Sequence, residues 1–374
     1  MDFNDKSSLW AAIGGQFAVG AIVAGVVFFG SIAYVGVPYW FGKTVVPTES
    51  EQIGFRGVAM GVTKFESEIE QQVADNEYVP YFEEPYPPAD GEELMRDIDF
   101  YENVQVLGGL TEANFNRLMG AITEWVSPEQ GCTYCHADDG NMASDEKYTK
   151  VVARRMIQMN WTINDGWGAH VNASGEGVGV TCYTCHRGQN VPEYIWFSSV
   201  PHENVGPSAA YQNRGVEQVA YSSLPTDAIE RYLVNYEPIS VSSYVPREPS
   251  EGTASIQHTE RTYALMMHFS ESLGVNCTYC HNSRAFYDAE QVTPYHSTAL
   301  LGIAMVQELN NEYLIPLQGE YPDNRLGPLG DAPKAYCATC HQGANQPLLG
   351  ANMLDQWPEL VSPEPVYEEA AATQ

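Results

Sequence analysis

The chain has few basic residues, and it has no cysteine outside one repeated motif. Lys and Arg together number 18 against 48 Asp and Glu, which gives a formal net charge of −30. So acidic a protein is repelled by nucleic acid, which excludes nucleic-acid binding as a natural function. A basic soluble protein would instead be attracted and steered to its surface. All eight cysteines belong to one short repeated motif, and none precedes Cys132.

Charge is also absent from Leu9 to Val37. This stretch exceeds the ~20 apolar residues that a helix needs to span a bilayer. Aromatic residues that suit the two membrane interfaces stand at its ends: Trp10, Tyr39, Trp40 and Phe41. A cleaved secretory signal is the alternative, but its apolar region usually has only ~7–15 residues. We therefore predict a retained transmembrane helix at 9–37.

The cysteines form four copies of Cys-x-x-Cys-His. The copies are Cys132-Thr-Tyr-Cys135-His136, Cys182-Tyr-Thr-Cys185-His186, Cys277-Thr-Tyr-Cys280-His281 and Cys337-Ala-Thr-Cys340-His341. Two thiols at this spacing can add to the two vinyl groups of a haem, and the adjacent histidine can then ligate the iron. A zinc site, a redox dithiol or a disulfide would explain the cysteines but not the histidine repeated four times. We predict four covalently bound haem c groups.

Haem attachment also orients the chain in the membrane. Thioether bonds to haem are made on the periplasmic side, so the residues from about Lys43 onward are expected in the periplasm. Residues 1–8 are then cytoplasmic, and the protein crosses the bacterial inner membrane once.

The segments ahead of the motifs repeat. Thr111 to Met119 matches Thr259 to Met266, and Ala153 to Gln158 resembles Gly302 to Gln307. The first segment has the apolar spacing of a helix. Such a helix can lie against the haem face opposite the motif histidine, where a thioether or imidazole would complete six-coordination. The expected fold is mainly α with little β, built from two pseudo-symmetric dihaem halves on one transmembrane helix.

Some distal ligands follow from the repeat. Met119 and Met266 occupy equivalent positions, 13 and 11 residues before their first cysteines, which favours Met266 over Met267. At the second haem, Met156 competes with Met159, one helical turn further on.

The fourth haem stays open at this point. The repeat favours Met305, but five histidines lie outside the motifs: His170, His202, His258, His268 and His296. Of these, His170 is expected to end the helix that carries Met156.

The chain resembles the tetrahaem cytochrome c subunit of photosynthetic reaction centres of purple-bacterial type, from about Ile53 to near the C-terminus. The segments that carry the resemblance are Gly54-Phe-Arg-Gly57, Leu110-Thr-Glu-Ala113, Ala121-Ile-Thr-Glu-Trp-Val-Ser-Pro128, Val152-Ala-Arg-Arg-Met156, Tyr263-Ala-Leu-Met-Met267, Ser272-Leu-Gly-Val-Asn-Cys277 and His341-Gln-Gly343.

This resemblance implies three haems with His/Met ligation and one with two histidines. The implied axial pairs are Met119 with His136, Met156 with His186, Met266 with His281, and His170 with His341. Many members of the family carry a lipid on an N-terminal cysteine, which this chain lacks, so its apolar helix would take over that anchoring role. The segment 172–179 is longer than the family pattern leads us to expect.

The resemblance also implies an electron carrier rather than an enzyme. Electrons would come from a soluble periplasmic donor, either a cytochrome c or a high-potential iron–sulfur protein. They would pass through four haems to the photo-oxidised bacteriochlorophyll special pair of the reaction-centre membrane subunits. The alternative, a membrane-anchored multihaem quinol dehydrogenase, would rely mainly on histidine ligands. A multihaem reductase would leave one iron open for substrate.

The expected organisation has seven parts. They are a cytoplasmic N-terminus at 1–8, the transmembrane helix at 9–37, an extended periplasmic segment on the partner surface at 38–100, a dihaem half at 101–200, an irregular connector at 201–257, a second dihaem half at 258–350 and an acidic C-terminal tail at 351–374.

Overall fold

A computed structural model describes most of the chain. The described residues are 6–41, 46–53, 60–76, 83–171, 178–203, 205–206, 209–239, 241, 255–286, 288–352 and 354–367. Two compact units are present: Met1–Glu49 with Phe65–Ser67, and Ser50–Lys64 with Glu68–Gln374. Among the described residues, the only sheet pairs β1 (Thr48–Gln52) with β2 (Gly61–Phe65). The prediction of a mainly helical fold with little β structure is therefore confirmed.

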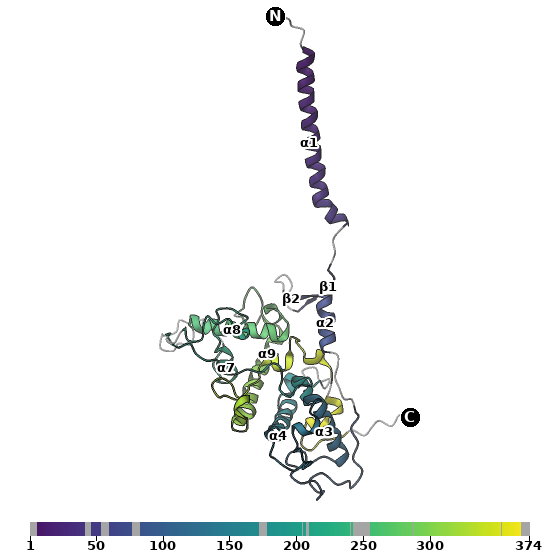
Figure 1. Cartoon of the computed structure of the whole chain (residues 1–374), viewed down its shortest axis with the longest axis vertical. Helices are drawn as coiled ribbons and strands as arrows, with labels where there is room; N and C mark the ends of the chain where they lie inside the picture. The colour runs from purple at the N-terminus through teal and green to yellow at the C-terminus, as the bar shows by residue number, and fades with distance from the viewer. Residues whose placement is uncertain are drawn as a thin grey trace, which may run out of the picture. The chain divides into compact units, whose positions relative to one another are not determined.

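The first unit consists chiefly of α1, Lys6–Phe41, drawn as one long helix in Figure 1. Its segment Phe17–Tyr34 is long and apolar enough to cross a membrane, and no other helix in the described part of the chain is. Large apolar side chains such as Phe17, Phe29 and Tyr34 are exposed along it. An apolar helix with exposed large apolar side chains fits a membrane-anchored protein. The four aromatic residues expected at the interfaces have side chains outside the described part.

Four longer helices of the second unit each precede one motif. They are α3 (Glu112–Val126), α4 (Tyr148–Trp161), α8 (Ile256–Leu273) and α9 (Pro294–Glu308). Two of them, α3 and α8, begin with a side-chain cap. Thr111 and Ser255 accept a hydrogen bond from a first-turn amide of α3 and α8, and Gly274 ends α8 in the left-handed conformation.

The remaining elements are shorter. The α-helices are α2 (Glu66–Asn76), α5 (Gly168–Val171), α6 (Cys182–His186), α7 (Ala228–Leu233) and α10 (Cys337–His341). Two π-helical turns, η2 (Thr162–Gly166) and η7 (Leu309–Leu314), continue α4 and α9 directly. The 3-10 turns are η1 (Gly131–Tyr134), η4 (Glu217–Val219), η6 (Cys277–Tyr279), η8 (Ile315–Gly319), η9 (Asp323–Arg325), η10 (Pro347–Gly350), η11 (Leu354–Gln356) and η12 (Pro358–Leu360).

Two hydrophobic clusters form the core of the second unit. One joins α3 to the C-terminal segment, where the rings of Trp125 and Trp357 meet edge to face with centroids 4.8 Å apart. The other joins α7, α8 and α9 through residues such as Tyr232, Leu265 and Val306. The first cluster packs the apolar side of α3 that the sequence spacing predicts.

The C-terminal segment differs from the expected acidic tail at 351–374. Trp357, Glu359 and Leu360 are buried, and Glu359 pairs with the equally buried Arg117 of α3 at 2.6 Å. Arg117 also donates to the carbonyl oxygen of Gln356 at 2.7 Å. This segment is therefore packed core up to at least Leu360, because its apolar side chains and its buried carboxylate have partners on α3.

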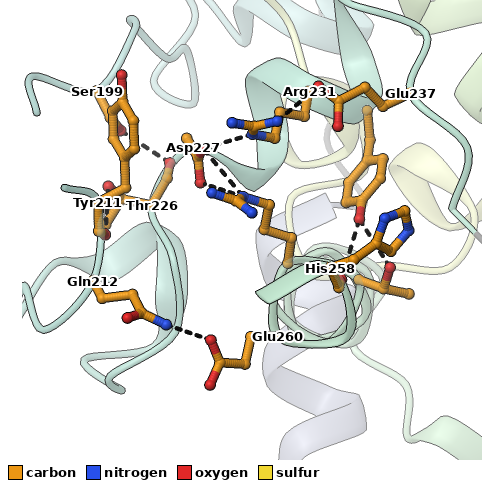
Figure 2. Close-up of polar contacts among 12 residues, drawn as sticks. Ser199, Tyr211, Gln212, Thr226, Asp227, Arg231, Glu237, His258 and Glu260 are labelled. Atoms are coloured by element: carbon orange, nitrogen blue, oxygen red, sulfur yellow. Dashed lines mark hydrogen bonds and ion pairs between the residues drawn. The ribbon is translucent and has the colours of Figure 1, made fainter. Parts of the chain in front are cut away.

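An ion pair holds the connector at 201–257 against α8. Asp227 accepts hydrogen bonds from Arg231 at 2.6 Å and from Arg261 of α8 at 2.9 Å. Figure 2 shows the Asp227 carboxylate beside Arg231, and nearby Gln212 of the connector donating to Glu260 of α8. The described part of the connector contains the helix α7.

The segment expected to be extended at 38–100 contains β1, β2 and α2, and among its later described residues, 83–100, no helix or strand is present. That later part is held by a buried amide. Asn114 of α3 accepts from the main-chain N–H of Tyr86 at 3.0 Å and donates to the Tyr86 carbonyl at 2.7 Å.

Candidate functional site

The four motifs adopt two local conformations. The second and fourth are the single-turn helices α6 and α10, and the first and third are the 3-10 turns η1 and η6. α6 and α10 both end in a non-glycine residue in the left-handed conformation, Arg187 with φ 50° and Gln342 with φ 48°. In both motifs the chain therefore changes direction sharply just after the motif histidine.

Three motif histidines present the same nitrogen to the main chain. Nδ1 lies 3.2 Å from the Met142 carbonyl in His136, 2.9 Å from the Gln189 carbonyl in His186, and 2.9 Å from the Ala344 carbonyl in His341. A carbonyl only accepts, so Nδ1 carries the proton in each ring. Nε2 then keeps its lone pair, which is the state required for binding a metal.

His281 of the third motif departs from this pattern. Its Nδ1 is buried and makes no hydrogen bond to the part of the chain that the structure describes. The ring lies beside Phe286, at a centroid distance of 5.5 Å, and beside His296 at 5.3 Å.

Burial keeps these imidazoles neutral. It lowers the pKa of His136, His186 and His281, and it lowers that of His341 to about 4. A neutral imidazole is the form that ligates iron, so the surroundings favour the ligand state at neutral pH.

The second and fourth motifs pack on α3 and α8 by an equivalent contact. Gly188 donates its N–H to the Trp125 carbonyl at 2.9 Å, and Gly343 donates to the Ser272 carbonyl at 2.8 Å. Gly274, which ends α8, approaches the second contact so closely that a Cβ there would lie 2.1 Å from the Gly343 oxygen. The close approach of the two backbones therefore requires glycine at 274.

His170 lies opposite the fourth motif. Its ring centroid is 6.4 Å from that of His341, with the ring planes at 66°. With metal–imidazole bonds of about 2 Å, two rings on opposite sides of one iron would have centroids roughly 6 Å apart. The Nδ1 of His170 lies 3.0 Å from the Thr298 carbonyl, so its Nε2 is also the unprotonated nitrogen.

Gly302 of α9 makes room for this ring. A Cβ on Gly302 would lie 2.7 Å from Cε1 of His170 and 3.1 Å from its Nε2. Because Gly302 has no side chain, the helix surface leaves space for the imidazole. Any larger residue at 302 would occupy that space.

The methionines fall into two groups. Met119 and Met266 are half-buried at the edges of the two core clusters. Met156 is half-buried too, and within the described residues it belongs to neither cluster, whereas Met159 packs against the core and Met305 lies inside it. Met156 is thus freer than Met159 to act as a ligand of iron. The side chain of Met305 is already buried in core packing.

The other histidines have different surroundings. His268 is buried and stacked on Tyr336 at 4.5 Å, and burial lowers its pKa to about 3. His258 is buried near Tyr232, at a centroid distance of 6.1 Å. His202 is exposed, and His296 lies beside His281.

The structure departs from the sequence prediction at two cysteines. Cys185 and Cys340, the second cysteines of two motifs, are joined by a disulfide with Cα atoms 4.5 Å apart. Because α6 and α10 are neighbours, their thiols are within reach of each other. A sulfur in this disulfide has no bond left for a haem, so the thioether assignment of these two residues stays a prediction.

The residues around the motifs otherwise fit a haem. Met142, whose carbonyl accepts from His136, and Phe286, whose ring lies beside His281, have exposed apolar side chains. Leu300 and Leu301 are exposed on α9, between Thr298 and Gly302, which both contact His170. Together with paired thiols and unprotonated imidazole nitrogens, such uncovered apolar surface is what an apolar, vinyl-bearing iron macrocycle requires.

Sequence comparison decides the family. The model of the photosynthetic reaction centre cytochrome C subunit matches residues 44–361. The chain belongs to this family. It is 51% identical over 356 residues to the photosynthetic reaction center cytochrome c subunit of Roseobacter denitrificans, covering 92% of this chain and 93% of that one. Over 333 residues it is 41% identical to the subunit of Rubrivivax gelatinosus, covering 88% and 87%. Over 327 residues it is 42% identical to that of Thermochromatium tepidum, covering 87% and 78%.

Membership of the reaction-centre cytochrome family confirms the resemblance that the sequence motifs indicate. A cytochrome c subunit binds haem covalently and carries electrons, which fits the prediction of an electron carrier. The quinol dehydrogenase alternative is not favoured. Two segments that entered the prediction, 54–57 and 172–177, lie outside the described residues.

Sequence reasoning missed two residues of the site, Gly302 and Thr298. Gly302 was noted only as part of a repeat, and Thr298 was not noted at all. A glycine inside a helix is a signal of close packing that could have pointed to the first. A carbonyl acceptor such as that of Thr298 has no side-chain signature.

Proposed function

We propose that the chain is the tetrahaem electron-transfer subunit of its reaction centre. It takes electrons from a soluble periplasmic donor, a cytochrome c or a high-potential iron–sulfur protein, and re-reduces the photo-oxidised bacteriochlorophyll special pair. The observation that carries the proposal is the facing pair His170 and His341, both with Nδ1 on a carbonyl, beside four Cys-x-x-Cys-His motifs.

The covalent and axial positions are assigned as follows. The cysteines that hold haem are Cys132, Cys135, Cys182, Cys185, Cys277, Cys280, Cys337 and Cys340. The axial pairs are Met119 with His136, Met156 with His186, Met266 with His281, and His170 with His341. When bound, each haem supplies one-electron chemistry at its iron. The chain sets the potential through ligand type, burial and nearby charge.

Two dihaem halves make up the haem-bearing part, 101–200 and 258–350. The recurring contacts of Gly188 with Trp125 and of Gly343 with Ser272 support this division, because they join equivalent elements of the two sequence repeats. The helix α1 anchors the chain in the lipid of the photosynthetic inner membrane as a single pass, with the haem-bearing part in the periplasm and beside the membrane subunits.

Flash spectroscopy of the purified membrane complex tests the function. After a flash oxidises the special pair, haem absorbance should change to the ferric form as the pigment is re-reduced, and a redox titration should resolve four one-electron transitions. If the pigment recovers while every haem stays ferrous, the proposed role is wrong.

A further inference from the structure

Two buried asparagines contact the second and fourth motifs in the same way. Asn164 lies in η2, the π-helical turn that follows α4, and Asn310 lies in η7, the turn that follows α9. Both side chains are buried. Each directs its amide to the residue that stands two positions before the first cysteine of a motif, Val180 or Ala335.

The hydrogen bonds are equivalent pair by pair. Asn164 accepts from the Val180 N–H at 2.8 Å and donates to the Val180 carbonyl at 2.8 Å. Asn310 accepts from the Ala335 N–H at 2.9 Å and donates to the Ala335 carbonyl at 2.9 Å. A side-chain amide that pairs with both polar groups of one residue fixes that residue in position and in rotation.

The elements that carry these asparagines also hold the proposed distal ligands. Met156 is on α4, which runs directly into η2. His170 contacts α9 at the Thr298 carbonyl and at Gly302. The helix α9 continues directly into η7. Each asparagine therefore joins the chain entering a motif to the element that places the ligand of the opposite face.

Chain length explains why only these two motifs need such a link. The first cysteine stands 6 residues after Val126, the end of α3, and 4 residues after Leu273, the end of α8. In the other two cases it stands 21 residues after Trp161, the end of α4, and 29 residues after Glu308, the end of α9. A short connection fixes its ends, whereas a long loop leaves them free to move apart.

We propose that Asn164 and Asn310 are positioning residues that set the separation of proximal and distal ligands, Asn164 at the haem of Cys182 and Cys185 and Asn310 at that of Cys337 and Cys340. The inference rests on the axial pairs given under Proposed function. It adds two residues that contact neither iron nor thioether sulfur and that act through the motif main chain.

The test is Asn164→Asp and Asn310→Asp in the membrane complex. Aspartate keeps the oxygen that accepts from the main-chain N–H, but an ionised carboxylate donates nothing to the carbonyl. Asn310→Asp should shift the midpoint potential and the low-spin spectrum of the bis-histidine haem alone. Asn164→Asp should change one His/Met haem and leave the bis-histidine haem as it was.

Asn114→Asp is the matched control, because Asn114 makes the same pair of hydrogen bonds to the main chain of Tyr86. Tyr86 is not next to any motif in the sequence. Asn114→Asp should lower the melting temperature without changing the haem on Cys182 or that on Cys337. If the two test variants only lower the melting temperature, as the control does, or if both change the same haem, the positioning role is wrong.

Two further measurements keep the outcomes separate. If an aspartate variant does not accumulate, Asn164→Ser or Asn310→Ser is examined by intact mass and spectroscopy, and a fully loaded chain with four unaltered haem spectra counts against the proposal. The unmodified complex must show three His/Met haems and one bis-histidine haem. A different count overturns the axial pairs themselves, whereas the expected count with insensitive variants overturns only the positioning role.

Discussion

His136 and Lys150 donate to one acceptor, the carbonyl oxygen of Met142. The histidine Nδ1 lies 3.2 Å from this oxygen and the lysine Nζ 2.6 Å from it. Lys150 is buried at α4 and also lies 3.4 Å from Asp145. A cation competing for the carbonyl weakens the hydrogen bond from the histidine, which makes the imidazole a less basic ligand.

We therefore expect Lys150→Met to lower the midpoint potential of the haem held by Cys132 and Cys135. Ferrous haem has one positive charge fewer than ferric haem, so loss of a nearby cation disfavours it. At an effective dielectric constant of about 20 the effect is on the order of 1 kcal/mol, or roughly 40 mV for one electron. Redox titration measures it. Lys64→Met is the control, since the Lys64 ammonium donates to the Gln72 side chain at 3.3 Å, and an equal shift in both variants would contradict the explanation.

Gly302→Ala should disturb the bis-histidine haem. The new Cβ would lie 2.7 Å from Cε1 of His170, so the ring must move away from α9. At an ordinary helix position the same change stabilises by about 0.5–1 kcal/mol. We expect a loss or weakening of the bis-histidine signal in low-temperature electron paramagnetic resonance. Gly319→Ala, where a Cβ would meet nothing within 4 Å, should leave the spectrum intact.

The ligand of the fourth haem can be tested directly. Methionine sulfur favours ferrous iron more than a second imidazole does. His170→Met should therefore raise the potential of one haem and change its spectrum from bis-histidine to His/Met character. Met305→Leu should leave ligation unchanged, because Met305 packs in the core. Loss of a His/Met signal in Met305→Leu, with no effect of His170→Met, would show that the sequence repeat was the better guide.

Arg117→Leu should destabilise the haem-bearing unit strongly. Its guanidinium and the Glu359 carboxylate are both fully buried, at 2.6 Å from each other. Breaking a buried pair by removing one partner typically costs about 3–5 kcal/mol, because the other charge is left without compensation. Thermal unfolding followed by circular dichroism measures the loss. Arg96→Leu removes the exposed pair with Glu364 and should change the melting temperature little, and similar effects of the two variants would argue against a special role of burial.

Donor binding should depend on salt if a basic cytochrome is the donor. The net charge of −30 attracts a basic protein over a distance set by the Debye length, which is about 10 Å at 0.1 M salt. Stopped-flow or flash measurements of the association rate should show a fall as ionic strength rises. A rate that does not depend on salt would indicate docking through apolar contacts, as an iron–sulfur donor could use.

Local sequence was sufficient for the parts of the site that depend on residue type and short spacing. The motifs, the helices before them and the preference for Met266 over Met267 follow from thiol chemistry, helical periodicity and the internal repeat. The choice of His170 over Met305 did not, since it came from family resemblance. Packing in the structure is consistent with the proposed choice, since Met305 lies in the core of α7, α8 and α9, while Gly302 of the same helix leaves room for the histidine ring.

Other features depend on contacts between distant residues. Glu359 seemed to belong to an acidic tail because its partner, Arg117, lies 242 residues earlier. The amides of Asn164 and Asn310 bind main-chain groups, which every residue offers equally. Neither pairing leaves a periodic pattern along the chain, so neither could be predicted from composition or spacing.

The neighbouring positions of Cys185 and Cys340 bear on how the protein is made. In the folded chain these thiols can capture each other. Their partners Cys182 and Cys337 have pKa values raised by burial to about 12, so few of them ionise to the reactive thiolate. If these cysteines hold haem as proposed, we expect attachment to occur while α6 and α10 are still apart and their thiols are reduced and accessible. On that expectation, covalent loading of the cofactors precedes the final packing of the polypeptide.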